Sequence, residues 1–274
     1  MGEDRKTYPT KIWLSFDWKQ AEMYFLCLFS KDSVLKQALY SQDFHSYVAS
    51  LLDNISIEDV NPTNREIAKA ISFNLIYSGF NAKITMANIL KKRPDLDEDQ
   101  VSDMLDKYQS TFFCLFNWVK KSVLNWRDNA GYMTYFMGAK KFIPVPKYVT
   151  ADCDPDKLLY TKQGRLCINT FGQNSVGLLL KSVCSKIFSN ALLREKTTQY
   201  IPLFDSLSFL ADTENLDYIL RAVDEYATPI ITHDGFEISM KVDWSISDKS
   251  WGDLKKFEYV NECKNKLYYQ WDIV

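Results

Sequence analysis

Four side chains that recur every four residues constrain this chain more than any other feature. They are Arg65, Lys69, Phe73 and Tyr77, within residues 64–79, NREIAKAISFNLIYSG. A step of four residues advances about 40° around an α-helix, so the four side chains form one ridge about 18 Å long. The segment therefore predicts a helix with a basic and aromatic edge.

The residues around this ridge also suit a helix. Asn61 and Pro62 predict an N-cap and a first helical position. The opposite face carries apolar residues that can pack inward: Ile67, Ala70, Ile71 and Leu75. Two cations followed by two rings suit a nucleoside triphosphate, because cations pair with phosphates and rings stack on base and sugar. A solvated helix with aromatic residues at the core edge is the alternative.

Composition limits the classes of protein and of site. The 274 residues are 46% hydrophobic, enough to bury one large core or two smaller ones. No apolar run reaches the roughly 18 residues of a membrane span, and the start lacks a signal peptide's apolar core, so we expect a cytoplasmic protein without a membrane partner. The six cysteines form no CxxC pair, which indicates reduced thiols. With two histidines, a metal site must consist mainly of carboxylates, which favours Mg²⁺ or Mn²⁺.

Two acids stand at the ends of predicted strands. Residues 11–18 alternate apolar and polar, which predicts a strand ending at Asp17, followed by a helix over 20–29. Residues 199–211 predict a strand, a turn and a strand, with Asp205 at the tip. If the two strands are neighbours in an antiparallel sheet, both carboxylates face one pair of magnesium ions. An acid at a strand end is also often a helix cap, so Asp17 alone leaves that alternative open.

The segment DWKQAEMYFLCLFSKD resembles motif A of family A DNA polymerases. The matching residues are Asp17, Gln20, Glu22, Ser30 and Asp32. The resemblance implies that Asp17 binds both catalytic metals, that Gln20 belongs to the nucleotide site, and that Glu22 blocks a ribose 2′-hydroxyl. Trp18 and Tyr24 depart from the family, which has Tyr and Arg there.

The ridge is similar to motif B, the fingers helix of the same family. The resemblance implies that Arg65 and the catalytic Lys69 neutralise charge on the triphosphate, while Phe73 and Tyr77 stack against the nascent pair. Ser78 departs from the glycine that the family has after the tyrosine.

Three further segments resemble the family. Residues 43–52 are similar to its DxHxxxA segment, which implies that His45 approaches the incoming triphosphate. A lone histidine on a helix is otherwise more often structural. Residues 131–144 predict a β-hairpin similar to GYvxTxxGRRRxlP, which implies DNA contacts from Lys140 and Lys141.

Residues 165–186 predict a helix pair or a bent helix and resemble RxxxNxxxQGxxAdxxK. The resemblance implies that Arg165, Asn169 and Gln173 face the minor groove of primer and template, where acceptors common to all base pairs allow shape checking. Taken alone, these residues form a polar stripe on an amphipathic helix.

The segment around Asp205 looks like motif C, usually VHDE, in which the aspartate is the second metal ligand. Phe204 replaces the histidine and Ser206 the glutamate; single-subunit RNA polymerases typically have serine at that place. Glu22 and Phe73 are of the DNA-polymerase type.

The remaining segments complete the expected architecture. We expect helices over 81–90 and 99–126, a surface-loop insertion over 146–164, a strand over 236–251 and an aromatic tail that either folds back or docks on a partner. The fold class is α+β, an antiparallel-sheet palm with a helical fingers subdomain. Its expected parts are a palm of 1–40 and 161–254, fingers of 41–160 and a tail of 255–274.

The resemblance implies two Mg²⁺ ions, with Mn²⁺ as a substitute, and primer–template DNA and dNTPs as partners. The family's thumb would lie before residue 12, and the net charge of −2 is low for a DNA-binding protein. We therefore expect a second chain carrying the thumb, with or without an exonuclease, in a split polymerase suited to a viral replisome in the host cytoplasm. The alternatives are half of a single-subunit-type RNA polymerase, or an inactive DNA-binding or assembly subunit.

Overall fold

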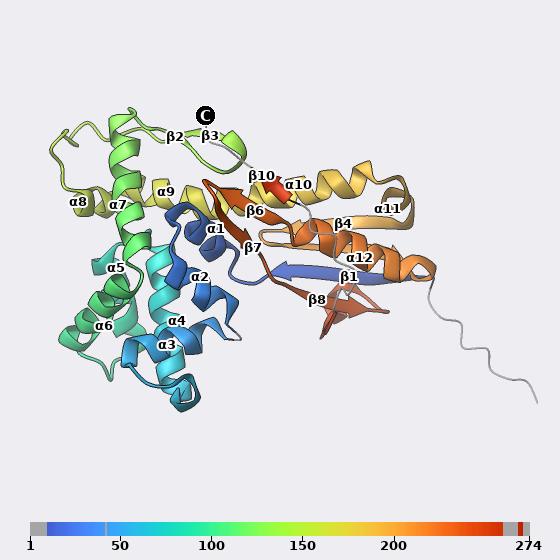
Figure 1. Cartoon of the computed structure of the whole chain (residues 1–274), viewed down its shortest axis with the longest axis horizontal. Helices are drawn as coiled ribbons and strands as arrows, with labels where there is room; N and C mark the ends of the chain where they lie inside the picture. Colours follow the sequence, from blue (N-terminus) through green and yellow to red (C-terminus); the bar gives the residue numbers. More distant parts are fainter. Residues whose placement is uncertain (1–9, 42, 260–267, 271–274) are drawn as a thin grey trace, which may run out of the picture. The chain divides into compact units, whose positions relative to one another are not determined.

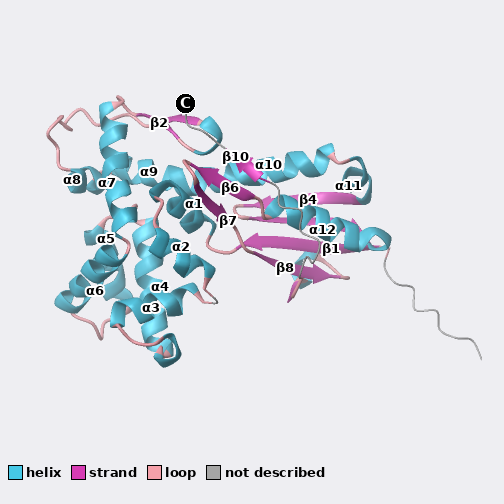
Figure 2. Ribbon diagram, viewed as in Figure 1, coloured by secondary structure: helices cyan, strands magenta, loops and turns pink. Residues whose placement is uncertain are grey.

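The computed structural model describes residues 10–41, 43–259 and 268–270 (Figure 1). The chain divides into two compact units, with breaks after Ala21 and before Val176. The described residues before the first break and after the second form a sheet unit, and residues 22–175 form a helical unit. Figure 2 shows strands in magenta and helices in cyan.

The main sheet of the sheet unit is antiparallel throughout, in the order β4-β5-β1-β8-β9. Its strands are β1 (Lys11–Trp18), β4 (Thr197–Leu203), β5 (Ser206–Asp212), β8 (Val242–Ser247) and β9 (Lys255–Phe257). A second sheet contains β6 (Ile230–His233), β7 (Phe236–Ser239) and β10 (Tyr268–Gln270), with β10 parallel to β6. The helices are α10 (Ser175–Ser189), α11 (Ala191–Lys196) and α12 (Leu216–Ala227), with 3₁₀ turns at Thr213–Asn215 and Trp251–Asp253.

Alternation along β1 divides its side chains between two faces. Phe16 and Trp18 are buried, and their rings meet edge to face with centroids 5.2 Å apart. The Trp18 indole N–H donates to the carbonyl of Ala227, the last residue of α12, at 2.6 Å. Asp17 lies between these aromatic residues and is exposed, so the pattern that builds the core also sends its carboxylate to the opposite face.

The helical unit contains most of the remaining elements. They are α1 (Ala21–Ser30), α2 (Ser33–Tyr40), α3 (Phe44–Asp53), a 3₁₀ turn (Ile57–Asp59), α4 (Pro62–Tyr77), α5 (Ala82–Lys92), α6 (Glu98–Thr111), α7 (Phe113–Asp128), β2 (Tyr132–Thr134), a 3₁₀ turn (Phe136–Gly138), β3 (Lys140–Phe142), α8 (Pro155–Tyr160), α9 (Lys162–Asn169) and a π-helical turn (Thr170–Asn174). None of the helices described is both long and apolar enough to cross a membrane.

Side-chain caps fix the starts of several helices. Asn61 caps α4 and is followed by Pro62, as the sequence predicts. Asp32 caps α2 through the N–H of Leu35, and its second oxygen accepts the N–H of Leu115 in α7. This buried motif A acid therefore links two helices of its unit.

Three expectations about element boundaries were wrong in detail. Residues 99–126 form two helices, because Phe112 leaves helical geometry and buries its ring against Tyr108. The expected loop over 146–164 contains α8 and the start of α9. The expected strand over 236–251 is two strands in different sheets.

The inward face of α4 also differs from the expected one. The buried residues there are Ala68, Ile71, Ser72 and Leu75, whereas Ile67 and Ala70 are only half-buried. The buried face is thus rotated by part of a turn from the one expected.

The described part of the aromatic tail folds back. β9 extends the main sheet, and the ring of Tyr259 lies 6.0 Å from that of Trp244. Residues 260–267 and 271–274, which include Trp271 of the expected tail, lie outside the described residues.

Gly79 generates a test of close packing within the helical unit. Its φ is +64°, and an added Cβ would lie 2.8 Å from the Cα of Arg165. Gly79→Ala should lower the free energy of unfolding by about 3 kcal/mol, through left-handed strain and overpacking together.

Gly138→Ala is the matched control, because Gly138 has φ +69° but open space around the added Cβ. It should cost only about 1 to 2 kcal/mol. Equal losses in denaturant titrations would contradict the packing contact.

Candidate functional site

The sheet places the two predicted acids side by side. Asp17 in β1 pairs in register with Ser206 of β5, and the N–H of Trp18 donates to the carbonyl of Asp205 at 3.0 Å. The two strands are therefore neighbours, as the prediction of a shared site requires. The metal-binding roles of both acids stay a prediction.

Asp205 lies in a tight loop between β4 and β5. Leu203 pairs with Ser206 across the loop, and Phe204 takes a positive φ of 51°. The Ser206 hydroxyl donates to the carbonyl of Leu203 at 2.9 Å, whereas the Phe204 side chain is 91% exposed. Of the two departures from motif C, Ser206 stabilises the turn, whereas Phe204 presents its ring to solvent.

Negative charge is concentrated around Asp17. Partial burial, together with the charges of Asp205 and Asp243, raises the pKa of the Asp17 carboxyl to about 6, while Lys256 opposes the shift. Burial also raises the pKa of Asp205. Neighbouring carboxylates that repel one another suit a hard divalent cation.

Among the described residues, no group of three or more His, Cys, Asp or Glu could hold a metal ion. The site thus offers the two predicted carboxylates. This fits Mg²⁺, which keeps several waters and also takes phosphate oxygens from a substrate.

Asp243 is a third acid near this site, and it was not predicted from the sequence. It lies in β8 directly opposite Asp17 and accepts from Lys19 at 2.6 Å and Lys256 at 2.7 Å. Burial opposes its ionisation, but the two lysines outweigh burial and lower the pKa of Asp243. The register of two strands far apart in the chain creates this position.

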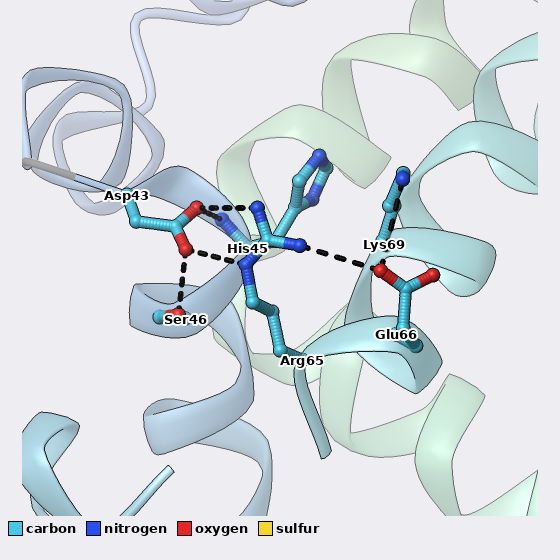
Figure 3. Close-up of polar contacts among 6 residues, drawn as sticks. All are labelled: Asp43, His45, Ser46, Arg65, Glu66 and Lys69. Atoms are coloured by element: carbon cyan, nitrogen blue, oxygen red, sulfur yellow. Dashed lines mark hydrogen bonds and ion pairs between the residues drawn. The ribbon is translucent and has the colours of Figure 1, made fainter. Parts of the chain in front are cut away.

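The helical unit gathers a second group of predicted residues (Figure 3). The Nε of Arg65 in α4 donates to Asp43, the cap of α3, at 2.6 Å, and Glu66 lies 3.3 Å from the same guanidinium. Lys69 is 3.7 Å from Glu66. Burial acts to raise the pKa of Asp43, but hydrogen bonds from Arg65 and Ser46 lower it to about 2. Both ridge cations therefore have acidic partners in this structure.

His45 lies beside the ridge. It is buried, and its ring centroid is 5.5 Å from that of Phe73. Its Nδ1 is buried without a hydrogen-bond partner among the described residues. Burial, the largest effect, lowers the pKa of His45 to about 4, so the imidazole is neutral at pH 7. Phe73 is 36% exposed, whereas the side chain of Tyr77 lies outside the described residues.

Three further predicted residues meet around a cavity of about 10 Å³ within the helical unit. Glu22, Asn169 and Gln173 line it together with Gly172. An added Cβ at Gly172 would lie 3.2 Å from the Cβ of Glu22, so the glycine allows a close approach.

The other predicted site residues lie apart from these groups. Gln20 takes φ 50° in the turn after β1. Arg165 donates to the carbonyl of Tyr160 at 2.8 Å. Lys140 and Lys141 lie in β3, the first exposed and the second half-buried.

Two departures from the family serve the core of the helical unit. Tyr24, in the place of an arginine, is buried and donates to the carbonyl of Leu39 at 3.1 Å. The Ser78 hydroxyl is also buried and lies 2.9 Å from that of Thr85. Both side chains are therefore engaged inside their unit.

The fold and the two residue groups define a palm-and-fingers class of protein. It has an antiparallel sheet with one acid on β1 and another in the turn before the adjoining β5, and between its sheet segments in the sequence it has a helical unit that carries a basic and aromatic helix. The family model described as DNA polymerase family A matches residues 5–253. The chain belongs to this family.

Relatives and a solved structure agree with this assignment. DNA polymerase I of Treponema pallidum is 27% identical over 248 residues, covering 88% of this chain and 23% of that protein. DNA polymerase I of Bacillus subtilis is 25% identical over 251 residues, covering 89% of this chain and 26% of that protein. The chain thus spans about a quarter of the length of these relatives.

The solved structure is the POL domain of Pol1 from M. smegmatis in complex with DNA primer-template and dNTP. It matches with a TM-score of 0.70 and 19% identity, over 86% of this chain and 39% of that chain. This likeness supports the fold.

His45 generates a pH test. Because its pKa falls from 6.5 to about 4 on folding, the unfolded chain binds the proton more tightly in that window. Stability should be lost as the pH falls from 6.5 to 4, by about 3 kcal/mol at most. His45→Gln should remove this part of the acid loss in urea titrations.

The difference between wild type and His45→Gln should be constant above pH 7, which serves as the internal control. Parallel stability profiles down to pH 4 would show that the imidazole is not held neutral.

Proposed function

We propose that this chain is the catalytic part of a DNA-templated DNA polymerase, which adds dNTPs to a primer 3′-hydroxyl. The observation that carries the proposal is the position of Asp17 at the end of β1 and of Asp205 in the turn that begins the adjoining strand β5, with the N–H of Trp18 bonded to the carbonyl of Asp205. Family membership and the likeness to a domain solved with primer-template and dNTP support it.

Asp17 and Asp205 are the residues that would hold two Mg²⁺ ions, or Mn²⁺ in their place. Bound there, the ions supply activation of the primer hydroxyl and charge neutralisation at the leaving pyrophosphate. The chain's own contribution includes an Asp17 carboxylate that is ionised at neutral pH, because its pKa is raised only to about 6. Strand pairing holds the two acids in place before any ligand arrives.

Arg65 and Lys69 would bind the triphosphate by exchanging their acidic partners for phosphate oxygens. The side chains of Lys69 and Glu66 are 42% and 60% exposed, and those of Arg65 and Asp43 are 38% and 37% exposed. Exposed pairs are worth only about 0 to 1 kcal/mol, so the exchange costs little at Lys69. It costs more at Arg65, whose hydrogen bond helps to lower the pKa of Asp43. Asp43 and Glu66 keep the cations oriented in the meantime.

The aromatic residues and His45 complete the proposed nucleotide site. Phe73 would stack on the incoming nucleotide together with Tyr77, and Gln20 would contribute a polar contact. Burial lowers the pKa of His45 to about 4, so the imidazole beside the ridge would be neutral when the nucleotide binds. Its role would therefore be orientation rather than charge.

Glu22 is the proposed gate against ribonucleotides. Its Cβ and Cγ lie close to Gly172, where an added Cβ would be 3.2 Å and 3.4 Å from them. The RNA-making alternative rests on Ser206, but that hydroxyl is used within the β4–β5 turn. The structural role of Ser206 favours the DNA-making proposal.

We propose that Arg165, Asn169, Gln173, Lys140 and Lys141 contact primer and template. A thumb, with or without an exonuclease, would come from a second chain, in line with the net charge of −2. Full primer extension by the purified chain alone would contradict this part of the proposal.

Asp17→Asn and Asp205→Asn test the reaction. Each should lower the rate of primer extension by about 10³-fold or more, because each removes a charge that the transition state requires. Asp212→Asn, an acid at the other end of β5, is the matched control and should retain extension.

Circular dichroism should show all three variants folded. Extension that survives both site substitutions would refute the polymerase proposal and favour the inactive DNA-binding alternative.

Glu22→Ala tests substrate choice. It should reduce discrimination between dNTPs and ribonucleotides by about 10- to 200-fold in kcat/KM, since only a local steric contact is lost. The exposed Glu58→Ala serves as control. Unchanged discrimination would place the gate elsewhere.

A further inference from the structure

The short strand β9 lies outside the residues that the family model matches, and it brings the cation Lys256 close to Asp17 and Asp243. β9 pairs with β8 through Trp244 with Phe257, Ser245 with Lys256, and Ile246 with Lys255. The family model matches residues 5–253, so β9 lies beyond the matched residues. Lys256 is therefore not among the residues that the family match covers.

Two lysines converge on one carboxylate beside the proposed catalytic acids. Asp243 accepts from Lys256 at 2.7 Å and from Lys19, in the turn after β1, at 2.6 Å. Asp243 itself stands in register with Asp17 on the adjoining strand. Residues opposite each other on paired strands share a face, with Cβ atoms about 4.5 to 5.5 Å apart.

Exposure shows which groups of this cluster are accessible to a ligand. The side chain of Lys256 is 77% exposed and that of Lys19 is 50% exposed, whereas the Asp243 side chain is 27% exposed. The carboxylate is therefore the shielded partner that orients two accessible ammonium groups. Lysine ammonium groups have three donors each, so both can take further acceptors.

The charges in the cluster do not balance. Two cations share one acid, which leaves a surplus positive charge once divalent ions neutralise Asp17 and Asp205. A purely structural ion pair explains this poorly, because exposed pairs contribute only about 0 to 1 kcal/mol. β9 is also held by its backbone pairing with β8 and by the contact of Tyr259 with Trp244.

We propose that Lys256 and Lys19 bind a phosphate group of the reacting substrates at the edge of the acid site, with Asp243 as their positioning residue. The ligand class is a phosphate oxygen, from the nucleotide triphosphate or from the primer backbone. This inference rests on the proposed polymerase function, because nucleotidyl transfer brings both kinds of phosphate to Asp17 and Asp205.

Equilibrium binding to the full chain tests the inference without turnover. The probes are a labelled dideoxy-terminated primer–template and, with it bound, the matching dNTP in Mg²⁺, both followed by fluorescence. Lys256→Gln should weaken one of the two ligands by about 3- to 10-fold.

The two sources of phosphate give different signatures. Loss of a primer contact lowers the slope of log K against log salt for DNA by about 0.9. Loss of a triphosphate contact leaves that slope unchanged and weakens the binding of dNTP. Asp243→Asn should weaken binding of the same ligand as Lys256→Gln does. Added to Lys256→Gln, it should weaken that binding much less than it does in the wild-type chain.

Lys255→Gln is the matched control, since the neighbouring residue of a strand points to the opposite face. If Lys256→Gln and Lys255→Gln bind each of the two ligands with equal affinity, the inference is overturned, whether or not the melting temperature falls.

Wild-type primer extension in the same preparation separates the two proposals. If wild type adds nucleotides to the primer and Lys256→Gln binds both ligands normally, this inference fails and the proposal of a polymerase reaction stands. If wild type neither extends primers nor binds either ligand, both proposals fail.

Discussion

The antiparallel pairing of β1 between β5 and β8 is the constraint on which the candidate chemistry depends. One pairing brings the Asp205 turn against the end of β1, and the other places Asp243 opposite Asp17. Because side chains alternate in a strand, a slip of one residue would send Asp17 into the core and an aromatic ring to the surface. Phe16 and Trp18 prevent that slip through their buried contacts, including the indole hydrogen bond to α12. The same apolar pattern therefore fixes both the core and the acids.

The local features of the site are those that the sequence could predict. Alternation around Asp17, the turn around Asp205 and the four-residue repeat of α4 are patterns within short segments, and each formed the expected element. Asp243 and Lys256 could not be found in this way, because their positions depend on the register of strands far apart in the chain. The break at Phe112 was missed because the apolar pattern continues across it. Burial of one ring at that point determines where the helix ends.

In both units, acids hold the cations that the proposed chemistry uses. Asp43 and Glu66 orient the ridge of α4, as Asp243 orients Lys19 and Lys256 in the sheet. Exposed pairs of this kind are weak, so they reduce the freedom of long side chains without competing strongly with phosphate. Residues that depart from the family fit this division of roles. Tyr24 and Ser78 serve the core, and Ser206 serves the turn that carries Asp205.

The central claim is that Asp17 and Asp205 form one divalent-cation site. Titration with Mn²⁺, followed by electron paramagnetic resonance in the presence of dideoxy-terminated primer–template and the matching dNTP, tests it most directly. We expect Asp17→Asn and Asp205→Asn each to weaken binding of the same Mn²⁺ by at least about tenfold, because the ligands act together. Mn²⁺ affinity that is unchanged by either substitution would contradict the central claim.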